Sequence, residues 1–280
     1  MGHAMQVLGD PMDFLMFSKK LGSLSMVQLG ETVSELGMDG VDLTVRPGGH
    51  IEPKEVSTEL PKAIEVLQSF GLSVTMITTG ITDPDDPASE NILSTAADCG
   101  VSYAKLGYWK YQGFGSLERQ IQEMRMDLSG IETMARVLGI TAAVHIHSGD
   151  YLTATGCLAH RILEGFDPVA LGAYIDPGHM VVEGGKSGWE LGMDLLAPLT
   201  RMMAVKDFVW VKEVGRDKSW KVKHAPLREG MVPWPEVFED LADISFDGPV
   251  SFHSEYGDLS VDETIAQTVD DLAYIREITG

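Results

Sequence analysis

Residues 173–179 read Ala-Tyr-Ile-Asp-Pro-Gly-His, an apolar run followed by an acid, a turn-forming pair and an imidazole. The run predicts a short buried strand that ends at Asp176, and the Pro-Gly pair predicts a sharp turn that returns His179 over the strand end. We interpret the segment as functional. The alternative is that Asp176 only caps a following helix, but residues 180–185 do not look like the prompt start of a helix.

Three further apolar runs in the second half of the chain end in residues that bind metals or move protons: Ala143–His147, Met203–Asp207 and Val250–Glu255. With residues 173–179 they recur at intervals of roughly 30 to 50 residues, as in a barrel of alternating strands and helices, whose active site lies at the carboxyl ends of the strands. The sequence therefore predicts an enzyme with a site assembled from strand ends.

The remaining sequence continues the same alternation. Strands are predicted at 13–17, 40–44, 72–77 and 101–106, helices at 27–36, 61–70, 117–138 and 261–278, and long loops at 44–52, 107–116 and 208–232. We predict an α/β fold, a (β/α)8 TIM barrel, with one domain over residues 1–280. An open doubly wound sheet ranks second, because no GxGxxG follows the first strand and the chain has no Gly-Lys-Ser/Thr phosphate loop.

Composition limits the classes of binding partner and the cellular compartment that we expect. A net charge of −21 argues against nucleic acid, which needs clustered Lys and Arg. No apolar run approaches the roughly 18 to 20 residues of a membrane span, and Met1–Met5 lacks a signal-peptide pattern, so we expect a cytoplasmic protein that does not bind membranes. A leader replaced by Gly2–Ala4 is compatible with this sequence. We expect Cys99 and Cys157 to be unpaired thiols.

Alternation along a strand places residues two apart on the same face. His145 therefore shares a face with His147, and the same rule pairs Ala204 with Lys206 and His253 with Glu255. Carboxylates and imidazoles that converge from separate strands form a divalent-cation site, in which Asp and Glu suit Mg²⁺ or Mn²⁺ and imidazole admits Zn²⁺ or Co²⁺.

At these residues the chain resembles the xylose-isomerase-like superfamily of barrels. It is most similar to the sugar phosphate isomerases/epimerases, which are related to ketose 3-epimerases, inosose dehydratase and endonuclease IV. The matching stretches are Phe17–Lys19, Gly40–His50, His147–Gly149, Asp176–Gly185, Val205–Phe208, Pro226–Trp234 and Pro249–Tyr256.

The resemblance implies a divalent metal held by Glu, Asp, His and Glu after strands five to eight. Asp176 and Glu255 match this pattern, whereas the first Glu falls at His145 and the His falls at Ala204. His179 matches an Asp-x-x-His element that binds a second metal or the substrate. These departures leave three alternatives: a rebuilt site with His145 or His147 as the nitrogen ligand, a weak site, or no metal.

Because two of the usual metal ligands are replaced, Lys206 becomes a candidate functional residue. An ammonium near the two carboxylates can replace the missing cation as a fixed positive charge, or carry a proton, and the competing interpretation is a structural ion pair. The candidate residues are, for catalysis, Glu255, Asp176, Lys206 and His147; for substrate, Arg46, His50, Lys105, Trp109, His179 and His253; and for metal, Asp176, Glu255, His145 and His147. Trp109, Trp210 and Trp234 are also candidates for an apolar wall against a sugar ring.

The first functional hypothesis is a sugar or sugar-derivative isomerase or epimerase that removes a proton next to a carbonyl, with Mn²⁺, Mg²⁺, Zn²⁺ or Co²⁺ as cofactor. The second is a lyase that dehydrates a keto-sugar or keto-cyclitol. The third is a barrel that only binds sugar. A nuclease is disfavoured by the charge. The expected partner is a small carbohydrate, and homo-oligomers are expected by analogy with the proteins that the chain resembles.

Overall fold

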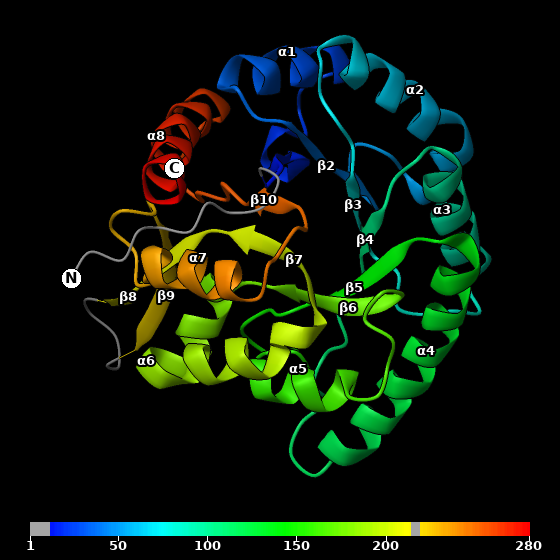
Figure 1. The fold of residues 1–280 in the computed structure, drawn as a ribbon, viewed down its shortest axis with the longest axis vertical. Coiled ribbons are helices and arrows are strands. Elements are labelled where there is room, and N and C mark those ends of the chain that lie inside the picture. The colour runs from blue at the N-terminus through cyan, green and yellow to red at the C-terminus, as the bar shows by residue number, and fades with distance from the viewer. Residues whose placement is uncertain (1–11, 214–218) are drawn as a thin grey trace.

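The computed structural model describes residues 12–213 and 219–280, and the segment Met1–Met5 lies outside these ranges. Parallel strands close into a barrel in the order β1-β10-β7-β6-β5-β4-β3-β2, and helices form a ring around it (Figure 1). The barrel strands are β1 (Phe14–Phe17), β2 (Gly40–Val45), β3 (Met76–Thr79), β4 (Tyr103–Lys105), β5 (Thr141–His145), β6 (Leu171–Ile175), β7 (Thr200–Val205) and β10 (Val250–Phe252). The predicted (β/α)8 barrel is confirmed, and the open-sheet alternative is wrong.

The helices follow the local signals in the sequence. They are α1 (Met26–Leu36), α2 (Val56–Ser69), α3 (Pro87–Asp98), α4 (Leu117–Leu138), α5 (Gly156–Leu163), α6 (Pro177–Leu196), α7 (Trp234–Asp243) and α8 (Val261–Thr279). Helix α4 has the predicted bounds and ends at Gly139, whose φ of 68° is the left-handed conformation that glycine adopts most easily. Helix α6 is interrupted at Gly185, where φ is 58° and ψ is −154°.

Two boundaries differ from prediction because tertiary contacts outweigh the local pattern. Strand β3 begins at Met76 and not at Leu72, since the Leu72 amide closes the end of α2 by donating to Leu67. Helix α2 begins at Val56, and Pro61 lies inside it, because a 3₁₀ turn that starts at Pro53 leads directly into the helix.

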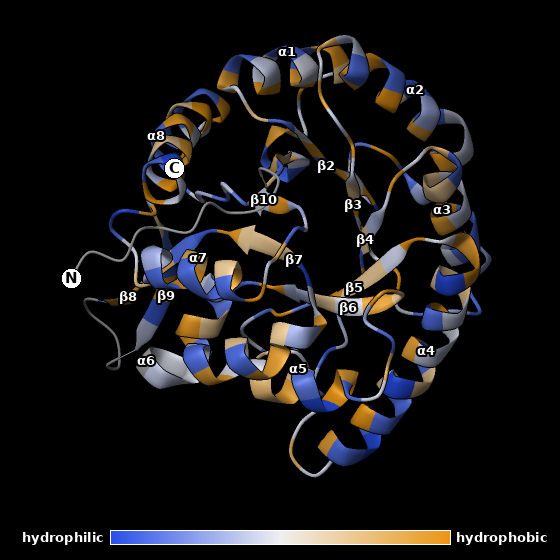
Figure 2. Ribbon diagram, viewed as in Figure 1, coloured by the Kyte–Doolittle hydropathy of each residue, from blue (hydrophilic) through white to orange (hydrophobic). Residues whose placement is uncertain are grey.

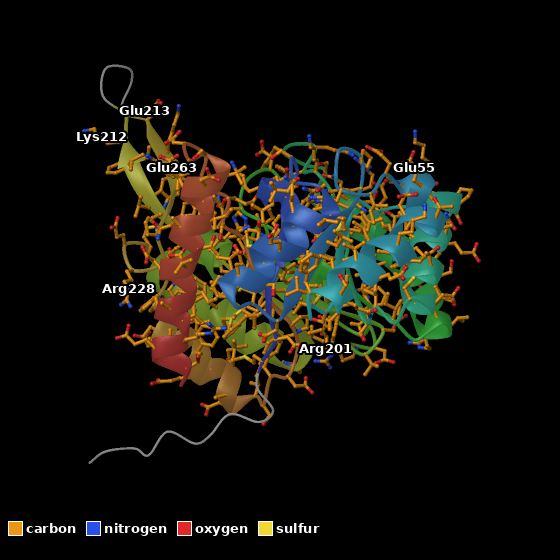
Figure 3. The ribbon with its side chains drawn as sticks, turned by 90° about the horizontal axis from the view of Figure 1, so that it is seen from above. Glu55, Arg201, Lys212, Glu213, Arg228 and Glu263 are labelled. Carbon is orange, nitrogen blue, oxygen red and sulfur yellow. The ribbon has the colours of Figure 1, made fainter. Side chains whose placement is uncertain are left out.

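The predicted loop at 208–232 is partly wrong, because it contains a two-stranded antiparallel hairpin. Strand β8 (Asp207–Lys212) pairs with β9 (Trp220–Ala225), with Phe208 opposite His224. Figure 3 shows Lys212 and Glu213 at the far end of this hairpin, toward the same edge of the molecule as Glu55 and Glu263, whereas Arg201 lies toward the opposite edge. Since Arg201 is near the start of β7, the hairpin extends from the carboxyl end of the barrel.

The buried residues form two clusters. The larger one lies between the strands and the helices, which carry both hydrophobic and hydrophilic residues around the ring (Figure 2). The smaller one belongs to the strands alone and comprises Leu15, Met76, Ala143, Tyr174, Met202 and Ala204, with Tyr103 packed against it. We call this second set the interior cluster. It fills the inside of the barrel and supports the residues above it.

Within the described ranges, no helix is both long and apolar enough to cross a membrane. Cys99 and Cys157 are free, as predicted.

Candidate active site

The interior cluster determines which side chains reach the carboxyl end of the barrel. Side chains two residues apart share a face, so each interior residue is followed two positions later by another inward residue. The residues that follow Tyr103, Ala143, Tyr174 and Ala204 in this way are Lys105, His145, Asp176 and Lys206. All of them are almost completely buried, which explains why so many polar groups meet at one end of an apolar barrel.

The centre of this site is an ion pair between Lys206 and Asp176. The Lys206 ammonium lies 2.9 Å from Oδ2 of Asp176 and 3.7 Å from Oε2 of Glu255. It also lies 3.3 Å from Nδ1 of His253. Burial raises the pKa of Asp176, but the charge and hydrogen bond of Lys206, together with His179 and His253, outweigh it, so the net pKa is below the ordinary value. Asp176 is therefore ionised at neutral pH and balances the ammonium.

Asp176 also begins helix α6. Its Oδ1 accepts a hydrogen bond of 3.1 Å from the backbone N–H of His179, and the helix starts at Pro177. The expectation that no helix follows promptly is therefore wrong. Gly178 lies in the first turn, where a Cβ atom would approach the Lys206 carbonyl oxygen to 2.5 Å. The glycine is thus needed for close packing against Lys206 and not for a turn.

Glu255 approaches the same ammonium from the end of β10. One of its oxygens forms an ion pair with Lys19, and the other lies 3.6 Å from Nδ1 of His253. Burial raises the pKa of Glu255, whereas His253, Lys206 and Lys19 lower it, and the balance is well below the usual value. With 13% of its side chain exposed, Glu255 is the carboxylate of the pair that a ligand can reach.

The histidines of the site are neutral at physiological pH. Burial, followed by the charge of Lys206, lowers the pKa of His147 and of His253 to about 4. The same two causes lower the pKa of His145 and of His179 well below the usual value. For His179 the burial is nearly complete. The positive charge of the cluster is therefore concentrated on its lysines.

The hydrogen bonds of His145 and His147 define their tautomers. Nε2 of His145 lies 3.0 Å from the Asp176 carboxylate, which can only accept, so Nδ1 accepts from the Tyr108 hydroxyl at 2.8 Å. In His147, Nδ1 donates to the Ser148 carbonyl at 2.8 Å, which leaves the Nε2 lone pair as a base. Both ring nitrogens of His145 are thus engaged, whereas His147 retains a free basic nitrogen.

His179 packs beside His147, with ring centroids 3.9 Å apart. Its Nδ1 is 2.8 Å from the Ser148 hydroxyl, and its buried Nε2 has no hydrogen-bond partner among the described residues. The structure therefore brings together His145, His147, Asp176, His179, Lys206, His253 and Glu255 of the predicted set.

Two cations lie across the site, on the β2 and β4 side. Lys105 is 2% exposed, and its ammonium lies 3.5 Å from the ring centroid of Tyr108. Arg46 follows β2, with its guanidinium 5.8 Å from the ring centroid of Phe17. Asp42, on β2 itself, is fully buried, and burial raises its pKa to about 6 despite hydrogen bonds from Ser251 and Thr78.

Other predicted residues are placed further out. The indole N–H of Trp109 donates to Asp127 on α4 at 2.9 Å, so this edge of the ring is directed to the outer helices. His50 lies against the Thr44 hydroxyl, and burial lowers its pKa. Trp234 is fully buried and donates to Asp207, so the expectation that it lines a sugar is wrong. Trp210 is exposed on β8.

Sequence reasoning assigned no role to Tyr108, Tyr174, Lys19 or Asp42. Asp42 could have been found, because it is an inward position of β2 under the same alternation rule. The other three act through contacts between distant segments, such as the 2.8 Å hydrogen bond between the Tyr174 hydroxyl and His253.

The donor set does not fit a divalent metal. The Lys206 ammonium lies between the two carboxylates that the sequence suggested as ligands, and both nitrogens of His145 are already used. In the part of the chain that the structure describes, no group of three or more His, Cys, Asp or Glu side chains is arranged to hold a metal.

The whole barrel is similar to known proteins. A family model described as a xylose isomerase-like TIM barrel matches residues 31–278. A 3-keto-D-glucoside 4-epimerase, YcjR, from E. coli has a TM-score of 0.71 at 15% identity, covering 95% of this chain and all of its own. A xylose isomerase-like barrel from Mycobacterium smegmatis in complex with magnesium gives 0.71 at 15% identity, with 96% and 98% covered.

A probable 3-DHS dehydratase, AsbF, from Bacillus anthracis gives a TM-score of 0.69 at 16% identity, with 94% of this chain and 99% of that chain covered. No curated protein matches the chain in sequence. At these identities the solved structures establish the fold alone.

Proposed function

Since the chain belongs to the xylose isomerase-like TIM barrel family, we propose that it is an enzyme that removes a proton next to the carbonyl of a sugar or sugar derivative, as an isomerase or epimerase. The observation that carries the proposal is the buried Lys206 ammonium held between Asp176 and Glu255. The fold likeness to a keto-glucoside epimerase supports the substrate class.

Lys206 supplies the electrophile in this proposal. Removing a proton next to a carbonyl places negative charge on the carbonyl oxygen, which must be stabilised as the charge develops. The ammonium has three N–H donors, and its position is defined by Asp176 and His253. It can therefore donate a hydrogen bond to a developing oxyanion without reorganisation. We derive no step through a metal, because the ammonium lies where the carboxylates would have to bind one.

Glu255 and His147 are the proton carriers. Glu255 is the reachable carboxylate, and His147 presents an unprotonated Nε2. They come from the ends of β10 and of β5 and so approach a ligand over Lys206 from different directions. Inversion of a carbon centre needs one proton carrier on each face.

The proposal is tested by incubating the protein in D₂O with D-fructose, with D-psicose and with a 3-keto-D-glucoside. Enzyme-dependent deuterium at the carbon next to the carbonyl, detected by NMR, is the expected result. The Glu255→Gln and Lys206→Met variants are expected to lose it, and the surface variant Lys62→Met, whose ammonium pairs with Glu59 on α2, is expected to retain it.

The mass of the product separates the two enzymatic hypotheses. An unchanged mass indicates an isomerase or epimerase, whereas loss of water indicates a lyase, which the likeness to a probable dehydratase keeps as the second candidate. Sugar binding without any deuterium exchange would support the barrel that only binds. Repeating the assay with Mn²⁺, Mg²⁺, Zn²⁺ or Co²⁺ tests the metal hypothesis, which stimulation by any of them would restore.

A further inference from the structure

The lysine on β4 has no hydrogen-bond partner in the described part of the chain. The Nζ atom of Lys105 is buried and makes no hydrogen bond within those residues. A buried ammonium without a partner is costly, and such groups are normally paired or hydrogen-bonded. The ring of Tyr108 lies against it, and this ring attracts a cation but satisfies none of its N–H donors.

Arg46 is a second cation on the same side. The ion pairs of the site involve Lys19, Lys206 and histidines, and none in the described ranges includes Arg46 or Lys105. Burial is the main cause that lowers the pKa of Lys105, and the charge of Arg46 is the next. Arg46 is partly exposed and Lys105 is buried, and the repulsion between their charges is a cost that a bound anion removes.

The backbone leaves space beside Arg46. Strand β3 runs between β2 and β4, with Val45 opposite Thr79 and Thr78 opposite Lys105. The next inward position after Thr78 is Gly80. A Cβ atom added there would meet only the Cβ of Arg46 within 4 Å, at 3.9 Å. Open space therefore borders Arg46 on the inward side of β3.

The balance of charged groups in the site bears on whether an anion binds beside Lys105 and Arg46. Lys19, Arg46 and Lys206 balance the carboxylates Asp42, Asp176 and Glu255, whereas burial holds the pKa of Lys105 well below its usual value. Asp176 and Glu255 are engaged by Lys206 and Lys19, which leaves only Asp42, among the described carboxylates of the site, near Lys105 and Arg46. A negatively charged ligand beside Lys105 would favour its charged form and satisfy the donors that have no partner among the described residues.

We propose that Arg46 and Lys105, with the space beside Gly80, bind an anionic group of the substrate, a carboxylate or a phosphate. This inference rests on the proposed function and deepens it. A sugar whose carbonyl lies over Lys206 extends across the barrel toward β2 and β4, so its anionic end meets the two cations. The guanidinium offers a planar pair of donors and the ammonium a point charge.

The test is calorimetric titration with D-fructose, D-fructose 6-phosphate, D-fructuronate and inorganic phosphate. At least one anionic sugar is expected to bind about 10- to 100-fold more tightly than D-fructose, as hydrogen bonds to charged groups imply. Tight binding of the phosphate ester or of the carboxylate identifies the source. The preference is expected to be lost in Lys105→Met and in Arg46→Gln, and to weaken with added salt.

Matched controls are Lys62→Met and Arg119→Gln, whose side chains are exposed on α2 and α4. Gly80→Val fills the space without removing a charge and is expected to weaken anion binding as well. Circular dichroism confirms folding, and Lys105→Gln replaces Lys105→Met if the latter does not fold. Equal affinity for neutral and anionic sugars, no binding of any anion, or a preference that survives in both cation variants would overturn the proposal.

Deuterium exchange separates the two proposals. Exchange into neutral sugars without any anion preference contradicts the anion site alone. Anion preference without exchange into any of the sugars supports the site and contradicts the proposed function.

Discussion

The Lys206 ammonium lies 2.9 Å from the Asp176 carboxylate, and both side chains are almost fully buried. Two charges withdrawn from water stabilise each other but gain little net stability together, whereas either one alone is expensive. Removing one member of the pair is therefore expected to destabilise the protein more than removing both.

Lys206→Met is expected to lower the free energy of unfolding by about 3 to 5 kcal/mol, because it leaves Asp176 charged and unpaired. The double variant Lys206→Met/Asp176→Asn should recover much of this loss, since Asn removes the charge and still caps α6. Urea denaturation of the wild type, both single variants and the double variant measures the coupling. Additive losses would contradict the ion pair.

Divalent metals are expected to leave the wild-type protein unchanged. The ammonium competes for the same carboxylates, so Mn²⁺, Mg²⁺, Zn²⁺ and Co²⁺ should not raise the melting temperature, and EDTA should not lower it. Elemental analysis after dialysis gives the stoichiometry. One tightly held metal per chain, lost in Asp176→Ala and in Glu255→Ala, would show that Lys206 moves aside.

Lys105→Met is expected to stabilise the fold by about 1 to 3 kcal/mol, because an unsatisfied buried donor is replaced by an apolar chain of similar length. The same substitution is expected to reduce anion binding, so stability and function change in opposite directions. Chemical denaturation of this variant beside Lys62→Met measures the effect. A destabilised Lys105→Met protein would indicate that Lys105 has a structural partner in solution.

Acid is expected to destabilise the fold through His253. Its pKa is about 4 in the folded protein and near 6.5 when unfolded, so the unfolded chain binds the proton first as the pH falls. The stability that it contributes is complete above about pH 6.5 and is lost toward pH 4, with a slope of up to about 1.4 kcal/mol per pH unit. Urea titrations between these pH values should give a shallower slope for His253→Gln. Equal slopes in both proteins would contradict the depressed pKa.

Gly178→Ala is expected to cost about 1 to 3 kcal/mol, because its Cβ would press on the Lys206 carbonyl and on the Phe208 ring. Gly188→Ala, in the same helix with nothing within 4 Å of the added atom, is the matched control and should be neutral or stabilising. Thermal melts compare the two. A harmless Gly178→Ala would mean that α6 can shift away from Lys206.

Much of the barrel and its central residues could be predicted from the sequence, because strand alternation is strictly local. Alternation places Asp176, Lys206 and Glu255 on the inward face, and their positions at strand ends place them at one end of the barrel. It does not give the partner of each group. Whether Lys206 binds Asp176 or points elsewhere depends on the distance between β6 and β7, which no local pattern encodes.

The same limit explains the errors. The start of β3 depends on how α2 ends, and the β8–β9 hairpin depends on cross-strand pairing between residues separated by a turn. In the Asp-Pro-Gly-His segment, Pro and Gly are typical turn residues, and Pro is also typical of a helix start. Composition alone therefore did not distinguish a turn after Asp176 from a helix that starts at Pro177.

Lys206 is the only residue between the last residue of β7, Val205, and the first residue of β8, Asp207. Lys206 therefore connects the barrel to the projecting hairpin. The hydrogen bonds between strands fix the backbone on both sides of it. Changes in hairpin length or register will be transmitted to the ammonium through a single peptide unit on either side. Changes to the hairpin are therefore expected to shift the Lys206 ammonium relative to Asp176 and Glu255.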